Sequence, residues 1–280
     1  MIIIKRIPFI GLLFVLTLSS CFKTIPVEKD IQLGALTSNN IHTDPKQYPL
    51  LDRAEYPETY KQMQRVVDNI LSSPEIKYRD IFMYDSITII NDDKTVNAFC
   101  TPGGYIFVYT GLIKMAQNED EMASVIGHEI AHAELRHTVK KLTRGVGRQA
   151  VIIAGLAAAG AAWGVWVAVE VGNKILGLGM GRDQENNADK YSVIYLGTSG
   201  HYSCIAIADF FETLVSSGKD VKIPPILSSH PDTENRIKRV KKWAAKYGYS
   251  TEYSNSPQFK LLQSSLDKAI ENEKKKEDKK

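Results

Sequence analysis

The pentapeptide His128-Glu129-Ile130-Ala131-His132 is the feature that most restricts how this chain can fold. Residues four apart lie on one face of a helix, so the side chains of His128 and His132 can bind a single metal ion if this segment is helical. Glu129 then projects from the adjoining side, where it can reach a water molecule on the metal without being a ligand. The pattern therefore predicts a zinc site on a helix more strongly than a chance pair of surface histidines.

The residues around the pentapeptide independently predict a helix. Asn118 can cap its start, and Glu121 follows three residues later, which is the spacing of a capping box. Apolar residues then recur at helical spacing and predict a face that packs on a core: Met122, Val125, Ile126, Ile130 and Ala133.

A catalytic zinc ion has three protein ligands and an open position, so a third ligand has to come from elsewhere. The metzincin arrangement needs glycine at position 135 and histidine at position 138, but the chain has Leu135 and Thr138. His137 lies five residues after His132, about 140° around a continuous helix. We therefore expect His137 to face away from the ion and to be an exposed polar residue.

Glu185 is the better candidate for the third ligand. It lies in the acidic segment from Asp183 to Asp189, which should begin a second helix. Asp189 falls one turn later on the same face, where it can accept an N–H from a zinc-bound imidazole and fix the tautomer of that ring. An acidic helix start that is simply favoured by the helix dipole is the alternative.

The N-terminus is typical of an export signal over residues 1–20. Lys5 and Arg6 precede an apolar run that is too short to span a bilayer, and small residues follow it. Leu18-Ser19-Ser20-Cys21 resembles a bacterial lipobox, which predicts a lipidated Cys21 and an anchored protein on the periplasmic face of a membrane, most simply the outer membrane. A plain secretory signal is the alternative. Cys100 and Cys204 could pair or stay as thiols, and their spacing does not decide between the two.

Several motifs together resemble the HtpX, Oma and CAAX-prenyl-protease family of zinc metallopeptidases. They are the stretch ASVIGHEIAHAEL at 123–135, the ExxAD pattern at 185–189, the HPxxxxR pattern from His230 to Arg236, and the segment at 97–107 before the active-site helix. With the lipobox, the chain looks like the periplasmic lipoprotein branch exemplified by BepA, LoiP and YcaL, without a C-terminal repeat domain.

The resemblance implies roles for individual residues. His128, His132 and Glu185 would bind one Zn²⁺ per chain, and Glu129 would be the general base. His230 would either stabilise the oxyanion or bind zinc in a latent form. Arg236 is a candidate for the same region, with a plain helix-surface arginine as its alternative.

The implied activity is hydrolysis of peptide bonds in misfolded or misassembled envelope proteins. The alternatives are an outer-membrane assembly factor or chaperone, in which the zinc site is structural or latent, and a structural lipoprotein with incidental histidines. Removing Lys5 and Arg6 with the signal reduces the formal charge from +3 to about +1, which gives no electrostatic reason to expect nucleic-acid binding. The expected partners are unfolded envelope proteins and the membrane that holds the lipid.

The fold class expected is α+β, a mainly helical zincin-type domain at 56–250 with a small antiparallel β-sheet before the HExxH helix. Helices are predicted at 58–73, from 183, at 203–215 and from 232, and strands at 81–90, 96–100 and 105–109. The last of these strands could offer an edge to an unfolded substrate, or it could be a core strand. Residues 21–55 are expected to form a tether and irregular lead-in, and 251–280 a charged tail that is weakly amphipathic after Ser254 and solvated from Glu271.

One segment, 149–169, is uncharged and long enough to cross a membrane. A single crossing there would separate His132 from Glu185 by a bilayer, so a core helix or hairpin, or a helix that contacts the membrane or substrate, is the preferred interpretation.

Overall fold

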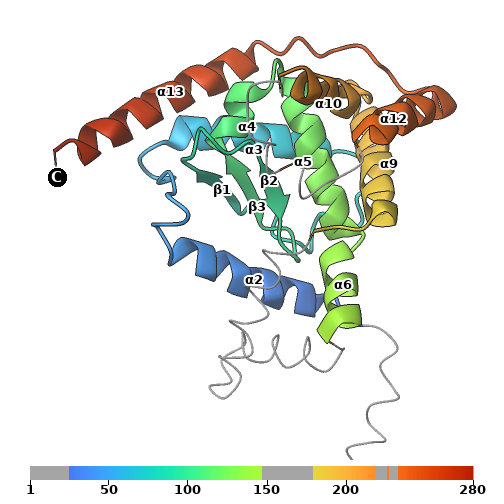
Figure 1. The fold of residues 1–280 in the computed structure, drawn as a ribbon, viewed down its shortest axis with the longest axis horizontal. Coiled ribbons are helices and arrows are strands. Elements are labelled where there is room, and N and C mark those ends of the chain that lie inside the picture. Colours follow the sequence, from blue (N-terminus) through green and yellow to red (C-terminus); the bar gives the residue numbers. More distant parts are fainter. Residues whose placement is uncertain (1–24, 147–178, 218–225, 227–232, 280) are drawn as a thin grey trace, which may run out of the picture.

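A computed structural model of the chain describes residues 25–146, 179–217, 226 and 233–279 (Figure 1). The elements in chain order are α2 (Glu28–His42), α3 (Pro57–Leu71), β1 (Ile87–Ile90), β2 (Ala98–Cys100), β3 (Ile106–Tyr109), α4 (Thr110–Met115), α5 (Glu119–Glu134), α6 (His137–Val146), α9 (Arg182–Ser199), α10 (Ala206–Ser217), α12 (Thr233–Tyr247) and α13 (Gln258–Glu277). This confirms a mainly helical domain with a small sheet. Within the described ranges, every helix is too short or too polar to span a bilayer.

The three strands form a mixed sheet in the order β1-β3-β2. The β2–β3 pair is antiparallel, as expected, but β1 runs parallel to β3. Gly103 and Gly104 have positive φ angles of 75° and 91° in the turn that joins β2 to β3, a conformation that favours glycine. Because β3 is the central strand, the expectation that it offers a free edge to substrate is wrong.

The sheet separates two apolar layers. Ile87, Ile89, Ile106 and Val108 face the main core, which also contains side chains of α3 and α5. The alternate residues Ile90 and Phe107 face a smaller cluster with Ile41 of α2. Figure 1 shows α2 and α3 on opposite sides of the sheet. Successive side chains of each strand point to opposite faces of the sheet, and those on each face pack against a helix.

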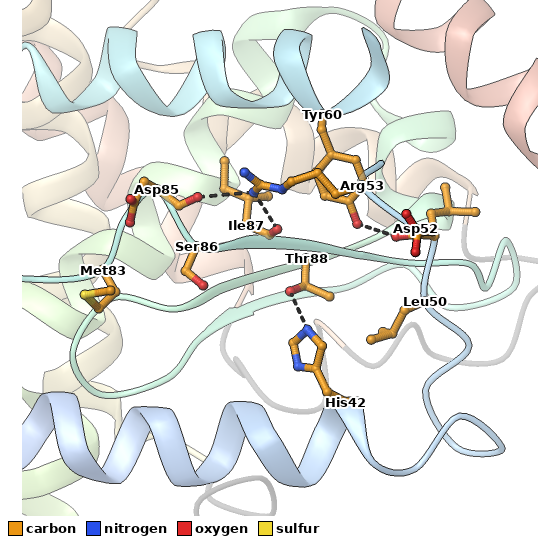
Figure 2. Close-up of a pocket in the computed structure, with 11 residues that line it drawn as sticks. His42, Leu50, Asp52, Arg53, Tyr60, Met83, Asp85, Ser86, Ile87 and Thr88 are labelled. Atoms are coloured by element: carbon orange, nitrogen blue, oxygen red, sulfur yellow. Dashed lines mark hydrogen bonds between the residues drawn. The ribbon is translucent and has the colours of Figure 1, made fainter. Parts of the chain in front are cut away.

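A pocket of about 480 Å³ lies along the outer side of β1, between α2 and α3 (Figure 2). Arg53 crosses it and donates from Nη2 to the carbonyl oxygens of Asp85 and Ile87, at 3.2 and 2.9 Å. The hydroxyl of Tyr60 accepts from the N–H of Ile89, at 3.1 Å. These side chains bind backbone groups at the edge of β1, so an added strand would have to displace them.

Helix α5 carries the HExxH pentapeptide through the middle of the molecule, and every residue of the helix is buried. The predicted cap is confirmed, because Oδ1 of Asn118 accepts from the N–H of Glu121 at 2.9 Å. The carboxylate of Glu121 accepts in return from the N–H of Gln117 at 3.0 Å, one residue earlier than in the usual capping box.

The expected irregular lead-in is partly wrong, because residues 28–42 form α2. Its inward face carries Asp30, Leu33, Gly34, Thr37 and Ile41. The spacing is helical, but several of these residues are polar or lack a side chain, so no apolar stripe appears in the sequence. Gly34 permits the packing, since a Cβ atom there would lie 1.8 Å from the carbonyl oxygen of Pro102.

The charged tail expected at 251–280 is mostly a helix, and only its end after residue 270 is largely exposed, as expected. Residues 258–277 form α13, whose buried side chains pack over α3 and α4: Phe259, Leu262, Leu266, Ala269 and Ile270. Thr59 of α3 donates to the hydroxyl of Ser265 at 3.0 Å. The many lysines and glutamates of this segment occupy the outer face, so the weak amphipathic pattern corresponds to a narrow buried stripe.

Three earlier predictions concern residues outside the described ranges: Cys21 with the signal segment, the uncharged segment at 149–169, and His230. Cys100 and Cys204 are described, and both are buried free thiols. Burial raises the pKa of each thiol, to about 11 for Cys204.

Candidate metal centre

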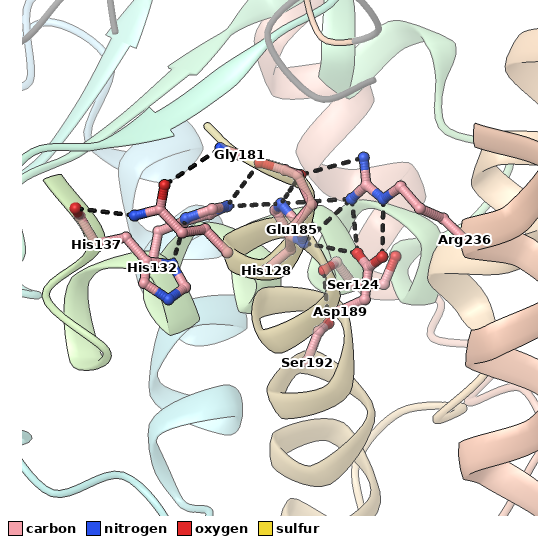
Figure 3. A network of polar contacts seen from close by, with 10 residues as sticks. Ser124, His128, His132, His137, Gly181, Glu185, Asp189, Ser192 and Arg236 are labelled. Carbon is pink, nitrogen blue, oxygen red and sulfur yellow. Dashed lines mark hydrogen bonds and ion pairs between the residues drawn. The ribbon is translucent and has the colours of Figure 1, made fainter. Parts of the chain in front are cut away.

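Helices α5 and α9 bring together the three residues that the sequence analysis proposes as metal ligands. One ligand atom each from His128, His132 and Glu185 lie within 4.8 Å of one another, and all three side chains are buried. The Nε2 atoms of the two imidazoles are 3.0 Å apart. The carboxylate oxygens of Glu185 lie 3.4 Å from Nε2 of His128 and 3.6 Å from Nε2 of His132. Figure 3 shows these groups converging between the two helices.

A close approach of α9 to α5 makes this convergence possible. Gly127 directly precedes the first histidine, and a Cβ atom there would lie 2.8 Å from Cδ1 of Leu196 and 3.3 Å from Oγ of Ser192. Ser192 also donates to the carbonyl oxygen of Ser124, at 2.9 Å. A larger residue at position 127 would therefore push away the helix that carries Glu185.

Asp189 lies where the sequence analysis places it, one turn after Glu185. Its Oδ1 is 2.9 Å from Nδ1 of His128, the ring nitrogen that points away from the ligand cluster. This contact orients the imidazole, as carboxylates commonly do for metal-binding histidines.

Arg236 is fully buried, so the alternative of a plain surface arginine is wrong. It donates from Nε and Nη2 to the two oxygens of Asp189, at 2.7 and 2.6 Å. Its Nη1 is 3.3 Å from Oε2 of Glu185, and its Cζ lies 4.3 Å from the ring centre of Phe211. Burial is the largest single influence and raises the pKa of Asp189, but the charge of Arg236 and the hydrogen bonds from Arg236 and His128 together outweigh burial and hold that pKa below its ordinary value.

His137 contradicts the expectation of an exposed residue. The helix ends at Glu134, Arg136 takes a positive φ of 55°, and a separate helix, α6, begins at His137. With the helix interrupted, Nδ1 of His137 lies 2.9 Å from Nδ1 of His132 in a buried contact. Burial, and then the charge of Lys140, lower the pKa of His137 to about 4, so its ring is neutral at neutral pH.

The charges around the cluster fit a divalent cation. Among the described residues, the buried carboxylates of Glu129, Glu185 and Asp189 face the single guanidinium of Arg236, which leaves two negative charges in excess when both imidazoles are neutral, as metal binding requires. Buried charge requires compensation, and two imidazole nitrogens with one carboxylate oxygen form a donor set that suits zinc. Burial alone lowers the pKa of His128, but hydrogen bonds to Asp189 and Glu185 raise it to about 9, so the cluster favours positive charge.

Glu129 lies within electrostatic reach of the cluster. Its side chain is buried beside His128 on α5, and its charge contributes to the raised pKa of Arg236. Two residues of this region were not predicted from sequence: His137, and Gln184, whose amide donates to the carbonyl oxygen of His137 at 3.0 Å. The spacing of Gly181 and Gln184 as a helix cap was the available signal for the second residue.

Comparison with protein families agrees with this geometry. Residues 57–244, about two thirds of the chain, match the family model described as peptidase family M48. The chain belongs to peptidase family M48. The matched region includes α3, the sheet, both ligand-bearing helices and Arg236, and membership implies a metal cofactor.

Curated relatives point the same way. The chain is similar to a putative beta-barrel assembly-enhancing protease of Vibrio cholerae, with 30% identity over 69% of this chain and 44% of the relative. It is 31% identical to the mitochondrial metalloendopeptidase OMA1 of Schizosaccharomyces pombe over 54% of this chain and 44% of the relative. The metalloprotease LoiP of Escherichia coli is 28% identical over 67% of this chain and 70% of its own length. The aligned part thus spans less than half of the first two relatives.

Proposed function

We propose that this member of family M48 is a zinc-dependent endopeptidase. The observation that carries the proposal is the buried cluster of two imidazoles and one carboxylate within 4.8 Å, contributed by His128, His132 and Glu185. These residues would hold the ion, which supplies Lewis acidity that makes water acidic near neutral pH and polarises a carbonyl group.

Residues of the chain would then transfer the protons and stabilise the negative charge that develops on the substrate. Glu129 accepts the proton of the attacking water and passes it to the leaving amine. Asp189 and Arg236 keep the His128 ring in one tautomer through the hydrogen bonds described above. We assign His230 to the oxyanion, with a latent zinc ligand as its other possible role.

The test replaces Glu129 by glutamine, which keeps the size of the side chain but cannot take up a proton. We expect zinc to stay bound at one ion per chain, while casein cleavage falls by about 10²- to 10⁴-fold. Glu252→Gln, at an exposed position, is the matched control and should retain activity. Chelator should stop cleavage by the unmodified chain, and added zinc should restore it. An active Glu129→Gln protein, free of contaminating protease, would refute the role of Glu129.

We further propose that the substrates are unfolded or misassembled envelope proteins. The support is the predicted export signal and the relatives named beta-barrel assembly-enhancing proteases. The test presents one outer-membrane β-barrel protein in two forms, unfolded in dilute urea and inserted in vesicles. Cleavage of the unfolded form alone supports the proposal, and equal cleavage of both forms contradicts it. An assembly factor without peptidase activity would cleave neither.

Substrate strands are proposed to add to β2 rather than to β3. The sheet order makes β2 an edge, and it packs beside α5. The N–H of Thr101 donates to the carbonyl oxygen of Tyr105, and the carbonyl oxygen of Asn97 accepts from the N–H of Tyr109. Backbone groups of successive residues in a strand point to opposite sides, so those of Ala98 and Cys100 point away from β3. In Glu129→Gln protein with an unfolded peptide, the amide hydrogens of Ala98 and Cys100 should exchange more slowly. Unchanged exchange at both would exclude strand addition there.

Lipidation of Cys21 is proposed as the membrane anchor, on the strength of the lipobox alone. Radiolabelled palmitate should label the full chain in cells of a two-membrane bacterium. Cys21→Ser should abolish the label and move the protein out of the outer-membrane fraction. A Cys21→Ser protein that remains in that fraction would show that another element holds it there.

A further inference from the structure

The second ring nitrogen of His132 faces another histidine rather than a carboxylate. Nε2 of His132 points to Glu185 and His128, whereas its Nδ1 lies 2.9 Å from Nδ1 of His137. The two ring centres are 4.9 Å apart with an angle of 70° between the planes. His132 is 3% exposed and His137 is 4% exposed, so bulk water does not compete for this contact. Figure 3 shows His137 on the far side of His132 from Glu185.

The chemistry of imidazole determines which ring donates. A neutral histidine that binds a metal through Nε2 carries its proton on Nδ1, so Nδ1 of His132 is a donor. The facing Nδ1 of His137 then has to accept, which puts the proton of His137 on its own Nε2. We propose that His137 is a positioning residue that accepts this hydrogen bond and holds His132 in its metal-binding tautomer and orientation. The inference deepens the proposed zinc function and rests on it.

Contacts from α2 and α9 hold His137 in place. The side chain of Arg136 donates from Nε and Nη2 to the carboxylate of Asp30 in α2, at 2.8 and 2.7 Å, and this fixes the turn directly before His137. Nε2 of Gln184 donates to the carbonyl oxygen of His137 at 3.0 Å, and Oε1 of Gln184 accepts from the N–H of Gly181 at 3.2 Å. Gln184 directly precedes Glu185 on α9. Its hydrogen bond to His137 therefore connects the residue that faces His132 to the helix that bears the third candidate ligand.

The two metal-binding imidazoles therefore have unlike supports. His128 faces Asp189, a carboxylate that also binds Arg236. His132 faces a histidine, which offers one acceptor without a formal charge. A partner of this kind typically contributes about 10- to 100-fold to metal affinity, so loss of the His137 acceptor should weaken zinc binding by a similar factor.

Two substitutions of His137 separate positioning from packing. In His137→Asn, the amide Oδ1 lies close to the place of the imidazole Nδ1 and can still accept. In His137→Leu, the side chain has a volume near that of histidine and fills the site, but it cannot accept a hydrogen bond. A packing role predicts that leucine is tolerated better than asparagine in this buried position, whereas a positioning role predicts the reverse order for zinc affinity.

The experiment measures zinc affinity of the full chain by competition with a chromophoric chelator, with thermal denaturation of each metal-free protein as a check of folding. We expect His137→Leu to bind zinc about 10- to 100-fold more weakly than the unmodified chain, and His137→Asn to lie within a few-fold of it. Equal affinity of His137→Leu and the unmodified chain would overturn the inference, as would a loss in His137→Asn as large as in His137→Leu.

A spectroscopic measurement reads the hydrogen bond itself. In zinc-loaded protein with ¹⁵N-labelled histidine, the Nδ1 proton of His132 should give a downfield, slowly exchanging signal. His137→Leu should remove this signal and His137→Asn should shift it; a signal unaffected by His137→Leu would overturn the inference. An unmodified chain that fails to bind zinc would refute the proposed function as well, whereas normal zinc binding in every variant refutes only the role of His137.

Discussion

Replacing Arg236 by methionine tests whether the buried charges around the metal centre depend on one another. Methionine keeps most of the aliphatic stem but removes the guanidinium that contacts both oxygens of Asp189 at 2.7 and 2.6 Å and Oε2 of Glu185 at 3.3 Å. Asp189 is fully buried and cannot move into water when its partner is lost. Removing one member of a buried ion pair typically costs about 3–5 kcal/mol.

That cost is a large part of the stability of an ordinary domain, about 5–15 kcal/mol. The assay is urea denaturation in excess chelator, and the slope of the transition should be unchanged, because the same surface is exposed on unfolding. Lys238→Met is the matched control on the same helix, at an exposed position, and should stay within about 0.5 kcal/mol of the unmodified protein. The double variant Asp189→Asn with Arg236→Met should be less destabilised than Arg236→Met alone, because it leaves no uncompensated carboxylate at position 189.

The effect of Arg236→Met should also depend on pH. In the unmodified protein Arg236 holds the pKa of Asp189 below its unfolded value, so the pair stabilises the fold above that unfolded value and this contribution is lost as pH falls. Without Arg236, burial raises the pKa of Asp189, so ionisation opposes folding as pH rises. The difference between the two proteins should therefore be smaller at pH 4.5 than at pH 7. A loss below about 1 kcal/mol at pH 7, or a double variant no more stable than Arg236→Met, would refute the reasoning.

Three further predictions concern the supports of the fold. Leu266→Ala should cost about 2–5 kcal/mol in urea denaturation because this side chain of α13 is fully buried, whereas Leu261→Ala, at a position that is 45% exposed, should cost little; equal effects would mean that α13 does not pack in solution. Asn118→Ala should cost about 1 kcal/mol in the same assay because the α5 cap is lost, and no change would exclude that role. Gly127→Val should weaken zinc binding in a chelator competition because its side chain displaces α9, and unaltered affinity would show that the helices can adjust.

The cluster of candidate ligands could be predicted from sequence because its members lie on regular helices. His128 and His132 share a face at a spacing of four, and Asn118 marks the start of the helix that carries them. Glu185 and Asp189 have the same spacing on a second helix, which the acidic helix start made visible. The meeting of these helices was not deducible from periodicity and was implied only by the family resemblance.

His137 could not be placed correctly because the sequence analysis extended α5 as a regular helix. The chain instead turns at Arg136, whose positive φ is unusual for a residue with a side chain. Contacts from distant residues hold this conformation, among them the carboxylate of Asp30 and the carbonyl oxygen of Ile25. Since such contacts depend on the completed fold, the local pattern favoured the wrong direction for the side chain.

Helix α2 could not be predicted for a similar reason, and it also affects the candidate metal centre. Its packing depends on glycines rather than on an apolar stripe: a Cβ atom on Gly103 would lie 2.5 Å from Cα of Ile31, and one on Gly34 would meet Pro102. Through Asp30, α2 also binds Arg136, directly before the residue that faces His132. A weakened Asp30–Arg136 pair should therefore affect the orientation of His132 more than that of His128. The ring of His128 is held by Asp189, which in turn binds Arg236. The two imidazoles of the candidate metal centre thus have different partners, and the HExxH pentapeptide supplies both imidazoles without specifying what supports either.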